Sequence, residues 1–184
     1  KEKKSVAVFS LEMGMEQVMM RILGSEAKIN IGDIRTGRVQ DSDWPKLISA
    51  ANRVGEANLF IDDTSGISPY EIRAKCRRLK AQKALDIVIV DYLQIMDLKM
   101  KVESRERAIA EISKNMKALA KELKVPVIVL SQINRGVEGR TDRRPMLSDL
   151  RESGSIEQDA DVVAMIYRDE YYDRENADNR GQAE

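Results

Sequence analysis

The sequence contains no histidine and only one cysteine, Cys76. The commonest general base and metal ligand is therefore missing, and a single cysteine cannot form a zinc site or a disulfide framework. No apolar run reaches the length of a transmembrane helix, so the simplest expectation is a cytoplasmic protein with no membrane partner. Any chemistry of this chain must rest on carboxylates, amides and cations.

A charge excess of either sign is also lacking. Lysine plus arginine and aspartate plus glutamate both total 31, which leaves a formal net charge of +0. Any binding of nucleic acid must then be local rather than driven by an overall positive field. The 184 residues, 42% of them hydrophobic, suit one globular domain with a real core.

Short apolar runs separated by helical patterns predict an alternation of strands and helices. Runs this short are typical of strands buried on both faces of a parallel sheet. The predicted strands are residues 6–9, 59–61, 87–90, 127–130 and 162–167.

Three kinds of pattern predict the helices. Ser68, Pro69 and Glu71 form a capping box with proline at the first helical position, which predicts a helix over 69–82. Two helices are predicted from apolar stripes, one formed by Met15, Met19, Ile22 and Leu23, and the other by Ile109, Ile112, Met116, Leu119 and Leu123. A further helix, capped by Asp41, is predicted to bury Trp44, Leu47, Ile48, Ala51 and Val54. Such alternation favours an α/β fold with a mostly parallel sheet covered by helices on both faces.

Polar side chains follow three of the predicted strands. Glu12 lies just beyond the first strand, Asp91 ends the third, and Gln132 lies just beyond the fourth. Because ligands of open parallel sheets bind at the carboxyl ends of the strands, these side chains should converge on one edge. Val90 followed by Asp91 has the form of a Walker B strand, whose carboxylate holds Mg²⁺, and the set suits phosphate hydrolysis. Taken singly, Asp91 could merely end a strand and Glu12 could be an exposed residue at a helix start.

At four places the sequence resembles the carboxy-terminal, RecA-like domain of the DnaB family of replicative helicases. Residues 9–13, 89–94, 129–135 and 148–161 are similar to successive motifs of that domain and occur in the family's order. The resemblance covers nearly all of the chain, and residues 148–161 carry its most specific motif. It implies an ATP-dependent DNA helicase that works as a homohexameric ring on single-stranded DNA, with ATP and Mg²⁺ as cofactors and with primase and a helicase loader as partners.

The resemblance also implies a role for each site residue. Glu12 activates the attacking water, Asp91 binds Mg²⁺ and the nucleotide, and Gln132 senses the γ-phosphate. Arg151, Glu152 and Gly154 lie on a loop that follows the phosphates of single-stranded DNA. Residues 132–151 are modestly basic and contain no aromatic residue, which predicts backbone contacts with little sequence preference. A second basic stretch, within residues 73–83, is more simply interpreted as a solvated helix face than as a DNA or subunit contact.

Two parts of the family pattern are missing from this sequence. It contains no glycine-rich loop ending in Gly-Lys-Ser/Thr, and it lacks the family's arginine finger. We therefore expect a RecA-like core over residues 1–168, incomplete at both ends and lacking its phosphate-loop strand, and a polar, flexible segment over 169–184. We also expect the chain to be a piece of a longer enzyme and to be inactive by itself. The alternatives are a RecA-fold recombination or repair ATPase, and a non-catalytic DNA-binding or loader-like paralogue.

Overall fold

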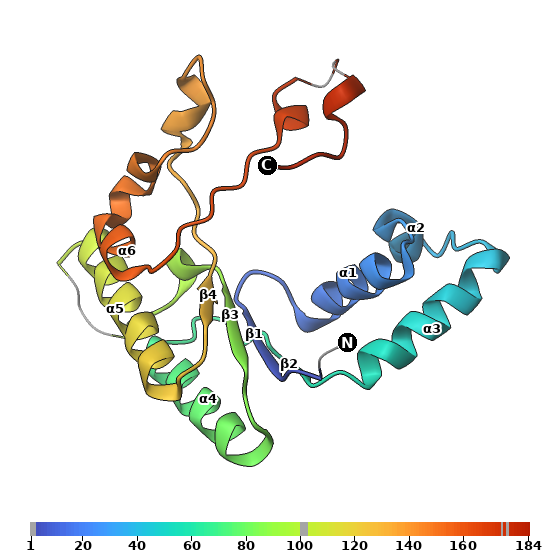
Figure 1. Ribbon diagram of the computed structural model, residues 1–184, viewed down its shortest axis with the longest axis horizontal. Helices are drawn as coiled ribbons and strands as arrows, with labels where there is room; N and C mark the ends of the chain where they lie inside the picture. Colours follow the sequence, from blue (N-terminus) through green and yellow to red (C-terminus); the bar gives the residue numbers. More distant parts are fainter. Residues whose placement is uncertain (1–2, 100–102, 174, 176) are drawn as a thin grey trace.

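The fold is built on a four-stranded, all-parallel sheet in the order β2-β1-β3-β4 (Figure 1). The computed structural model describes residues 3–99, 103–173, 175 and 177–184, and the side chains of residues 151–153 and 177 lie outside this description. The strands are β1 (Val6–Ser10), β2 (Leu59–Asp62), β3 (Ile87–Asp91) and β4 (Val127–Val129). Four of the five predicted strands are therefore confirmed, as is the α/β fold class.

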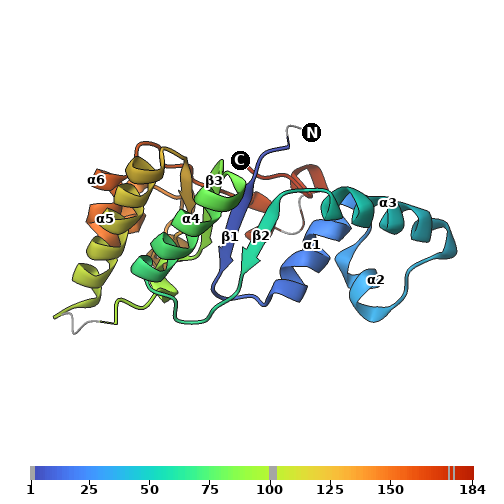
Figure 2. The same cartoon turned by 90° about the horizontal axis from the view of Figure 1, so that it is seen from below.

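The helices fall into two groups on either side of these strands. Figures 1 and 2 both show α4 and α5 on one side of the sheet and the group α1 to α3 beyond β2. The α-helices are α1 (Met15–Ala27), α2 (Ile31–Thr36), α3 (Trp44–Gly55), α4 (Pro69–Lys83), α5 (Arg105–Leu123) and α6 (Gly154–Asp159). Short 3-10 turns are η1 (Asp41–Asp43), η2 (Leu93–Ile95), η3 (Arg135–Gly139), η4 (Leu147–Ser153), η5 (Asp169–Tyr171) and η6 (Ala177–Asn179).

The hydrophobic core lies between the sheet and the pair α4 and α5. Phe9, Val88 and Val90 point from the strands into it, where they join Ile72 of α4 and Leu119 of α5. The apolar stripe predicted for α5 is buried throughout, and the capping box predicted for α4 is present. Local sequence patterns thus predicted both helices that cover this face.

The opposite face of the sheet is less well covered. Val6, Val8 and Ile89 alternate with the core residues and are only half-buried, and Ile128 of the edge strand β4 is 48% exposed. The prediction that the strands are buried on both faces therefore holds only for the face under α4 and α5. The reason is that strand composition reports apolar side chains and does not report which neighbours cover them.

Residues 162–167, predicted to form a fifth strand, form no strand. Val162 and Ile166 are 84% and 77% exposed. Among the described residues, the backbone of this segment pairs only at Tyr167, which exchanges two hydrogen bonds with Glu184. The prediction was wrong because apolar composition does not by itself provide pairing: residues 162–166 form no backbone hydrogen bond with another described segment, including the edge strand β4.

The position of α3 also differs from the prediction. Asp41 does not cap this helix, because the 3-10 turn η1 precedes it and α3 begins at Trp44 without a side-chain cap. The buried residue is Ala50, whereas Trp44 and Ile48 are 52% and 59% exposed. Of the other residues predicted to be buried, Leu47 and Val54 are half-buried and Ala51 is exposed, so helical spacing alone did not show which side of α3 packs against α1. None of the described helices combines the length and apolarity needed to cross a membrane.

Candidate functional site

The strand register brings the three predicted site residues to one edge of the sheet. Ser10 at the end of β1 lies beside Asp91 at the end of β3, and Val90 lies beside Val129 at the end of β4. All strands are parallel, so the segments that follow these ends leave from the same edge. Glu12, Asp91 and Gln132 therefore stand on segments that leave neighbouring strands at that edge.

The short loop that carries Glu12 is held at several points. The Leu11 amide donates to the Asp91 carbonyl oxygen at 2.7 Å, and the buried Ser10 hydroxyl donates to the Met13 carbonyl oxygen at 2.8 Å. The Met15 amide donates to Asp63 Oδ2 at 2.8 Å, which fixes the start of α1. The Glu12 side chain is exposed and has no hydrogen bond or ion pair with a described residue.

The Asp91 carboxylate is half-buried and, within the described chain, has no hydrogen-bond or ion-pair partner. The carboxylate is therefore left available to solvent or to a ligand at this edge. Asp62, which ends β2 on the other side of β1, behaves differently. Burial alone would raise the pKa of Asp62, but hydrogen bonds from Lys75 and Thr64 lower it overall, so this carboxylate is a structural ion pair between β2 and α4.

Magnesium would need ligands in addition to those of the protein at this edge. Among the described residues, no group of three or more histidine, cysteine, aspartate or glutamate side chains could enclose a metal ion. Asp91 nevertheless offers the hard oxygen ligand that Mg²⁺ prefers, and this ion commonly takes one or two carboxylates and completes its shell with phosphates and water. The residues present therefore fit an ion held jointly with a nucleotide.

The segment after β4 is held by Gln94, a residue for which the sequence predicted no role of its own. The Gln132 amide donates to Gln94 Oε1 at 3.2 Å, and Gln94 Nε2 donates to the Gln132 carbonyl oxygen at 3.2 Å and to Ser131 Oγ at 2.8 Å. The Gln132 side chain itself is exposed and has no partner in the described structure. The only sequence signal for Gln94 was its place in the motif at 89–94.

The basic loop after Gln132 is closed by Asp149. Asp149 Oδ2 accepts hydrogen bonds from the Met146 amide and from Arg140 Nη2, both at 2.7 Å, and its carbonyl oxygen accepts one from the Asn134 amide at 3.0 Å. The Met146 hydrogen bond, assisted by Arg140, lowers the pKa of Asp149. The loop is therefore a closed unit rather than a free segment.

The predicted DNA-binding residues lie at the end of this loop. The side chains of Arg151 and Glu152 lie outside the described residues. Gly154 begins α6 and is exposed, and a Cβ added to it would meet nothing within 4 Å. Local packing thus gives no reason for a glycine at this position.

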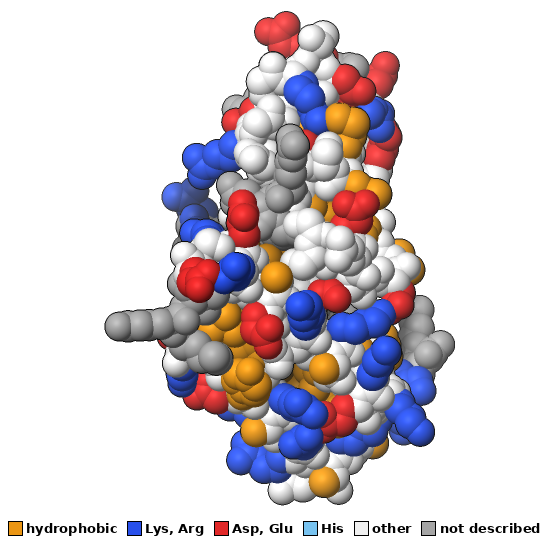
Figure 3. Space-filling view, turned by 90° about the vertical axis from the view of Figure 1, so that its left-hand side faces the viewer, with side chains coloured by type: hydrophobic (Ala, Val, Ile, Leu, Met, Phe, Trp, Pro, Cys, Tyr) orange, Lys and Arg blue, Asp and Glu red, His pale blue; other side chains and the backbone are white. Residues whose placement is uncertain are grey.

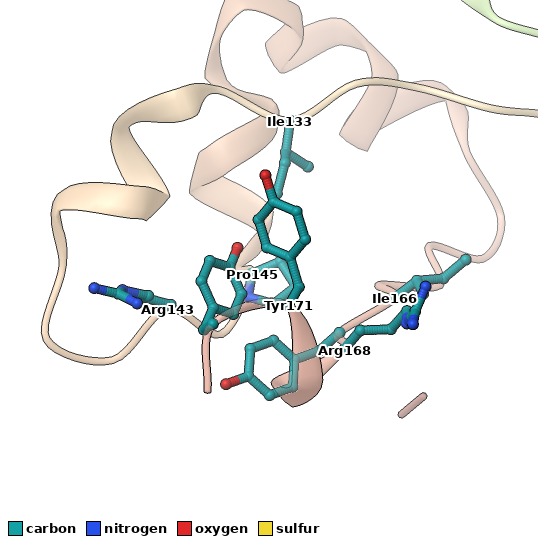
Figure 4. A pocket seen from close by; sticks show the side chains of 8 residues that line it. Ile133, Arg143, Pro145, Ile166, Arg168 and Tyr171 are labelled. Atoms are coloured by element: carbon teal, nitrogen blue, oxygen red, sulfur yellow. The ribbon is translucent and has the colours of Figure 1, made fainter. Parts of the chain in front are cut away.

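Tyrosines from the end of the chain lie against the same loop. The guanidinium groups of Arg143 and Arg144 lie over the rings of Tyr172 and Tyr167, at 5.1 Å and 4.7 Å from the ring centroids. Figure 4 shows the pocket of about 160 Å³ at this contact, which is lined by Ile133, Arg143, Pro145, Ile166, Tyr167, Arg168, Tyr171 and Tyr172. The loop has no aromatic residue of its own, but the tertiary structure places aromatic rings beside it.

The second basic stretch, on α4, is largely tied to the rest of the chain. Arg73 and Arg77 both pair with Glu122 of α5, Lys75 pairs with Asp62, and Lys80 donates to the Leu85 carbonyl oxygen. In the view of Figure 3, basic side chains gather toward the lower end of the molecule, with acidic side chains among them. These contacts support the interpretation of this stretch as a packed and solvated helix face.

Comparison with known proteins gives consistent matches over nearly the whole chain. The chain is 53% identical over 176 residues to the replicative DNA helicase DnaC of Bacillus subtilis (strain 168) and 50% identical over 177 residues to the replicative DNA helicase DnaB of Geobacillus stearothermophilus. These alignments cover 95% and 96% of this chain, which spans only 39% of the length of each relative.

Solved structures give the same result. A DnaB-like replicative helicase, solved in a study that also addresses its interactions with primase, superposes with a TM-score of 0.90 at 42% identity, covering 95% of this chain and 42% of that one. A second solved structure, an ATPase domain, also has a TM-score of 0.90 at 42% identity, covering 95% of this chain and 63% of that one. The predicted RecA-like fold class is thereby confirmed. Because a model of the DnaB-like helicase C-terminal domain matches residues 1–184, the chain belongs to that family.

Proposed function

We propose that this chain is the ATP-hydrolysing motor domain of a replicative DNA helicase. The observation that carries the proposal is the contrast at the carboxyl edge of the sheet. The backbone around Glu12, Asp91 and Gln132 is held by hydrogen bonds, whereas none of their side chains has a partner among the described residues. Such preorganised but unpaired polar groups are what a site for a charged ligand requires.

The chemistry at this edge divides among the three side chains. Asp91 would hold Mg²⁺ together with the phosphates of ATP, and the bound ion would neutralise charge that develops on them. Glu12, on its short loop, would accept a hydrogen bond from the attacking water and orient it. Gln132 would contact the γ-phosphate, and its backbone continues directly into the basic loop. Nucleotide state could thus reach the loop that carries Arg151, Glu152 and Gly154, which would contact the phosphates of single-stranded DNA.

The proposed partners follow from the family and from the relatives. One of the similar structures is that of a helicase that interacts with primase. For the full-length protein we propose a homohexameric ring in the cytoplasm with nucleotide sites between subunits, engaging primase and a helicase loader. The 184-residue sequence contains no Gly-Lys-Ser/Thr loop, so we expect no ATP hydrolysis from it alone.

The test compares Glu12→Gln with Asp91→Asn in the full-length protein. Glu12→Gln keeps the shape of the side chain but loses its basicity, so Mg-ATP affinity should stay near normal while hydrolysis falls by roughly 10² to 10⁴. Asp91→Asn should also weaken nucleotide binding, and this loss should appear only when Mg²⁺ is present. Equilibrium binding of a fluorescent ATP analogue and steady-state turnover separate the two effects.

Two results would count against this assignment. Near-normal turnover in Glu12→Gln would return Glu12 to the role of an exposed residue before α1. Absence of any turnover in the unmodified full-length protein would favour the non-catalytic, DNA-binding alternative.

A further inference from the structure

Beyond the ends of β3 and β4, the segments that follow the two strands are joined first by backbone hydrogen bonds and then by hydrogen bonds from a side chain. The Leu130 amide donates to the Val90 carbonyl oxygen at 2.9 Å, and the Leu93 amide donates to the Leu130 carbonyl oxygen at 3.0 Å. The next two residues after β4, Ser131 and Gln132, have no backbone hydrogen bond to the segment after β3 within the described structure. The carboxamide of Gln94 takes over that pairing.

A primary amide is well suited to this contact because it presents both a donor and an acceptor. Gln94 Oε1 accepts from the Gln132 amide, which can only donate, and Gln94 Nε2 donates to the Gln132 carbonyl oxygen, which can only accept. The side chain thus pairs with both backbone groups of one residue, as a neighbouring strand would. Its third hydrogen bond, 2.8 Å from Nε2 to Ser131 Oγ, holds the preceding residue as well.

Gln94 itself is anchored by the core. It lies on the turn η2, directly after Leu93, which is buried. It stands three residues beyond Asp91 and is half-buried, whereas the Gln132 side chain is exposed and unpaired in the part of the chain that the structure describes. The Gln132 backbone therefore takes its position from a residue of the segment that carries Asp91.

We infer that Gln94 is a positioning residue, which holds Gln132 at a set place relative to Asp91. The inference rests on the proposed function, because the contact between Gln94 and Gln132 affects catalysis only if Gln132 senses the nucleotide. Gln94 does not itself touch the substrate. Loss of the hydrogen bonds from Gln94 to Gln132 leaves Asp91 in place but lets Gln132 move. ATP binding should therefore survive while the response of Gln132 to the γ-phosphate is lost.

The test uses Gln94→Met and Gln94→Glu in the full-length protein. Methionine has a similar length but makes none of the three hydrogen bonds. Glutamate keeps an acceptor for the Gln132 amide and places a second acceptor against the Gln132 carbonyl oxygen. Gln82→Met is the matched control, since Gln82 is exposed on α4 and has no partner among the described residues.

We expect both Gln94 variants to lower the kcat of DNA-stimulated ATP hydrolysis roughly 10- to 100-fold, the range expected for a misplaced catalytic group. Mg-ATP affinity and the midpoint of thermal unfolding should stay close to those of the control. A double-mutant cycle then separates positioning from general damage. In a Gln132→Ala background, Gln94→Met should have little further effect, because the group that it positions is already gone.

The outcomes distinguish the sensor from the residue that positions it. Gln132→Ala with normal kcat would remove the sensor from the proposed function, and the inference with it. A clear loss in Gln132→Ala would retain the sensor. In that case, equal fold losses for Gln94→Met in both backgrounds, or no loss at all, would overturn the positioning role alone.

Discussion

Cys76 is completely buried on the inner side of α4, among the residues that pack against the sheet. Burial raises the pKa of its thiol to about 12, and the carboxylate of Asp62 adds to this effect. The thiolate is the reactive form of cysteine, so both access and ionisation disfavour reaction. Cys76 is also the only cysteine of the 184 residues, which makes it a specific reporter of the core.

We predict that the folded 184-residue chain does not react with a thiol reagent near neutral pH, and that one thiol reacts in denaturant. Labelling at a fixed reagent concentration, followed by mass spectrometry, measures this directly. Circular dichroism of the same sample verifies that the chain is folded, and Cys76→Ser gives the background. Rapid labelling of a folded sample would show that α4 does not pack on the sheet as described.

Two aspartates at the carboxyl edge of the sheet differ in whether they have an ion-pair partner. Asp62 has an ion-pair partner in Lys75, whereas Asp91 on a nearby strand has no partner among the described residues. The two aspartates both end apolar strands, so composition alone does not tell them apart. The packing of α4 against β2 does, because it brings Lys75 to only one of them.

At the scale of elements, the start of α4 is one of the best-defined features. The Ser68 hydroxyl accepts from the Glu71 amide, and Glu71 Oε2 accepts from the Ser68 amide at 2.8 Å. Lys99 Nζ also donates to Glu71 Oε1 at 2.7 Å. Hydrogen bonds from Lys99 and then Ser68 lower the pKa of Glu71 from its ordinary 4.5 to about 2.

The depressed pKa of Glu71 predicts how stability depends on pH. The contribution of this carboxylate is fully present above about 4.5, its ordinary pKa, and is lost as pH falls toward about 2, where it becomes protonated in the folded state. The thermal midpoint of Glu71→Gln should therefore fall less steeply over this window than that of the parent. Ser68→Ala, which removes the cap, should cost about 1 kcal/mol at neutral pH. Thermal unfolding of the parent and both variants at several pH values measures these effects. The prediction for Glu71 is wrong if the midpoint of Glu71→Gln depends on pH as steeply as that of the parent.

A second element-scale prediction uses Gly154 at the start of α6. Its backbone angles, φ −52° and ψ −18°, are ordinary for any residue, and an added Cβ has free space. Gly154→Ala should therefore stabilise the fold by about 0.5–1 kcal/mol. If DNA approaches the backbone there, the same change should weaken binding of a fluorescent single-stranded oligonucleotide to the full-length protein.

Gly55→Ala is the matched control for this pair of measurements. Gly55 is exposed at the end of α3, and an added Cβ would likewise meet nothing within 4 Å. Gly55→Ala should stabilise the fold to a similar extent and leave DNA affinity unchanged. Unchanged DNA affinity in Gly154→Ala would place Gly154 away from the DNA.

At the scale of the whole molecule, the 184 residues carry balanced charge, so the proposed contact with DNA must depend on local basic groups. We predict that Arg151→Ala in the full-length protein weakens single-stranded DNA binding about equally for all sequences, since phosphate contacts carry no base information. The slope of log affinity against log salt should become shallower by roughly 0.7 for one lost phosphate contact. Titrations at several salt concentrations with two unrelated oligonucleotides measure both properties.

Lys114→Ala provides the control for charge. Lys114 is exposed on α5 and has no partner among the described residues, so its loss changes net charge without touching the loop. Its salt slope should match that of the parent. If Arg151→Ala also leaves the slope unchanged, Arg151 does not contact a phosphate.

The sequence by itself determined the parts of the fold that depend on near neighbours in the chain. The capping box at Ser68 predicted the start of α4, and a single apolar stripe predicted the buried face of α5. Four short apolar runs predicted strands, and the polar residues after three of them predicted a shared edge. These patterns could be read because caps and periodicity act over three or four residues, or over one strand.

The tertiary structure decided what depends on distant partners. Residues 162–167 have the composition of a strand, but Val162 and Ile166 stay exposed and the segment does not pair with the described strands. Ala50 rather than Trp44 is buried on α3, which packs against α1. Gln94 contacts Gln132, 38 positions away, and the tyrosines reach a loop that has no aromatic residue. Burial and pairing between such residues are fixed only when the whole chain packs, so no local pattern could predict them.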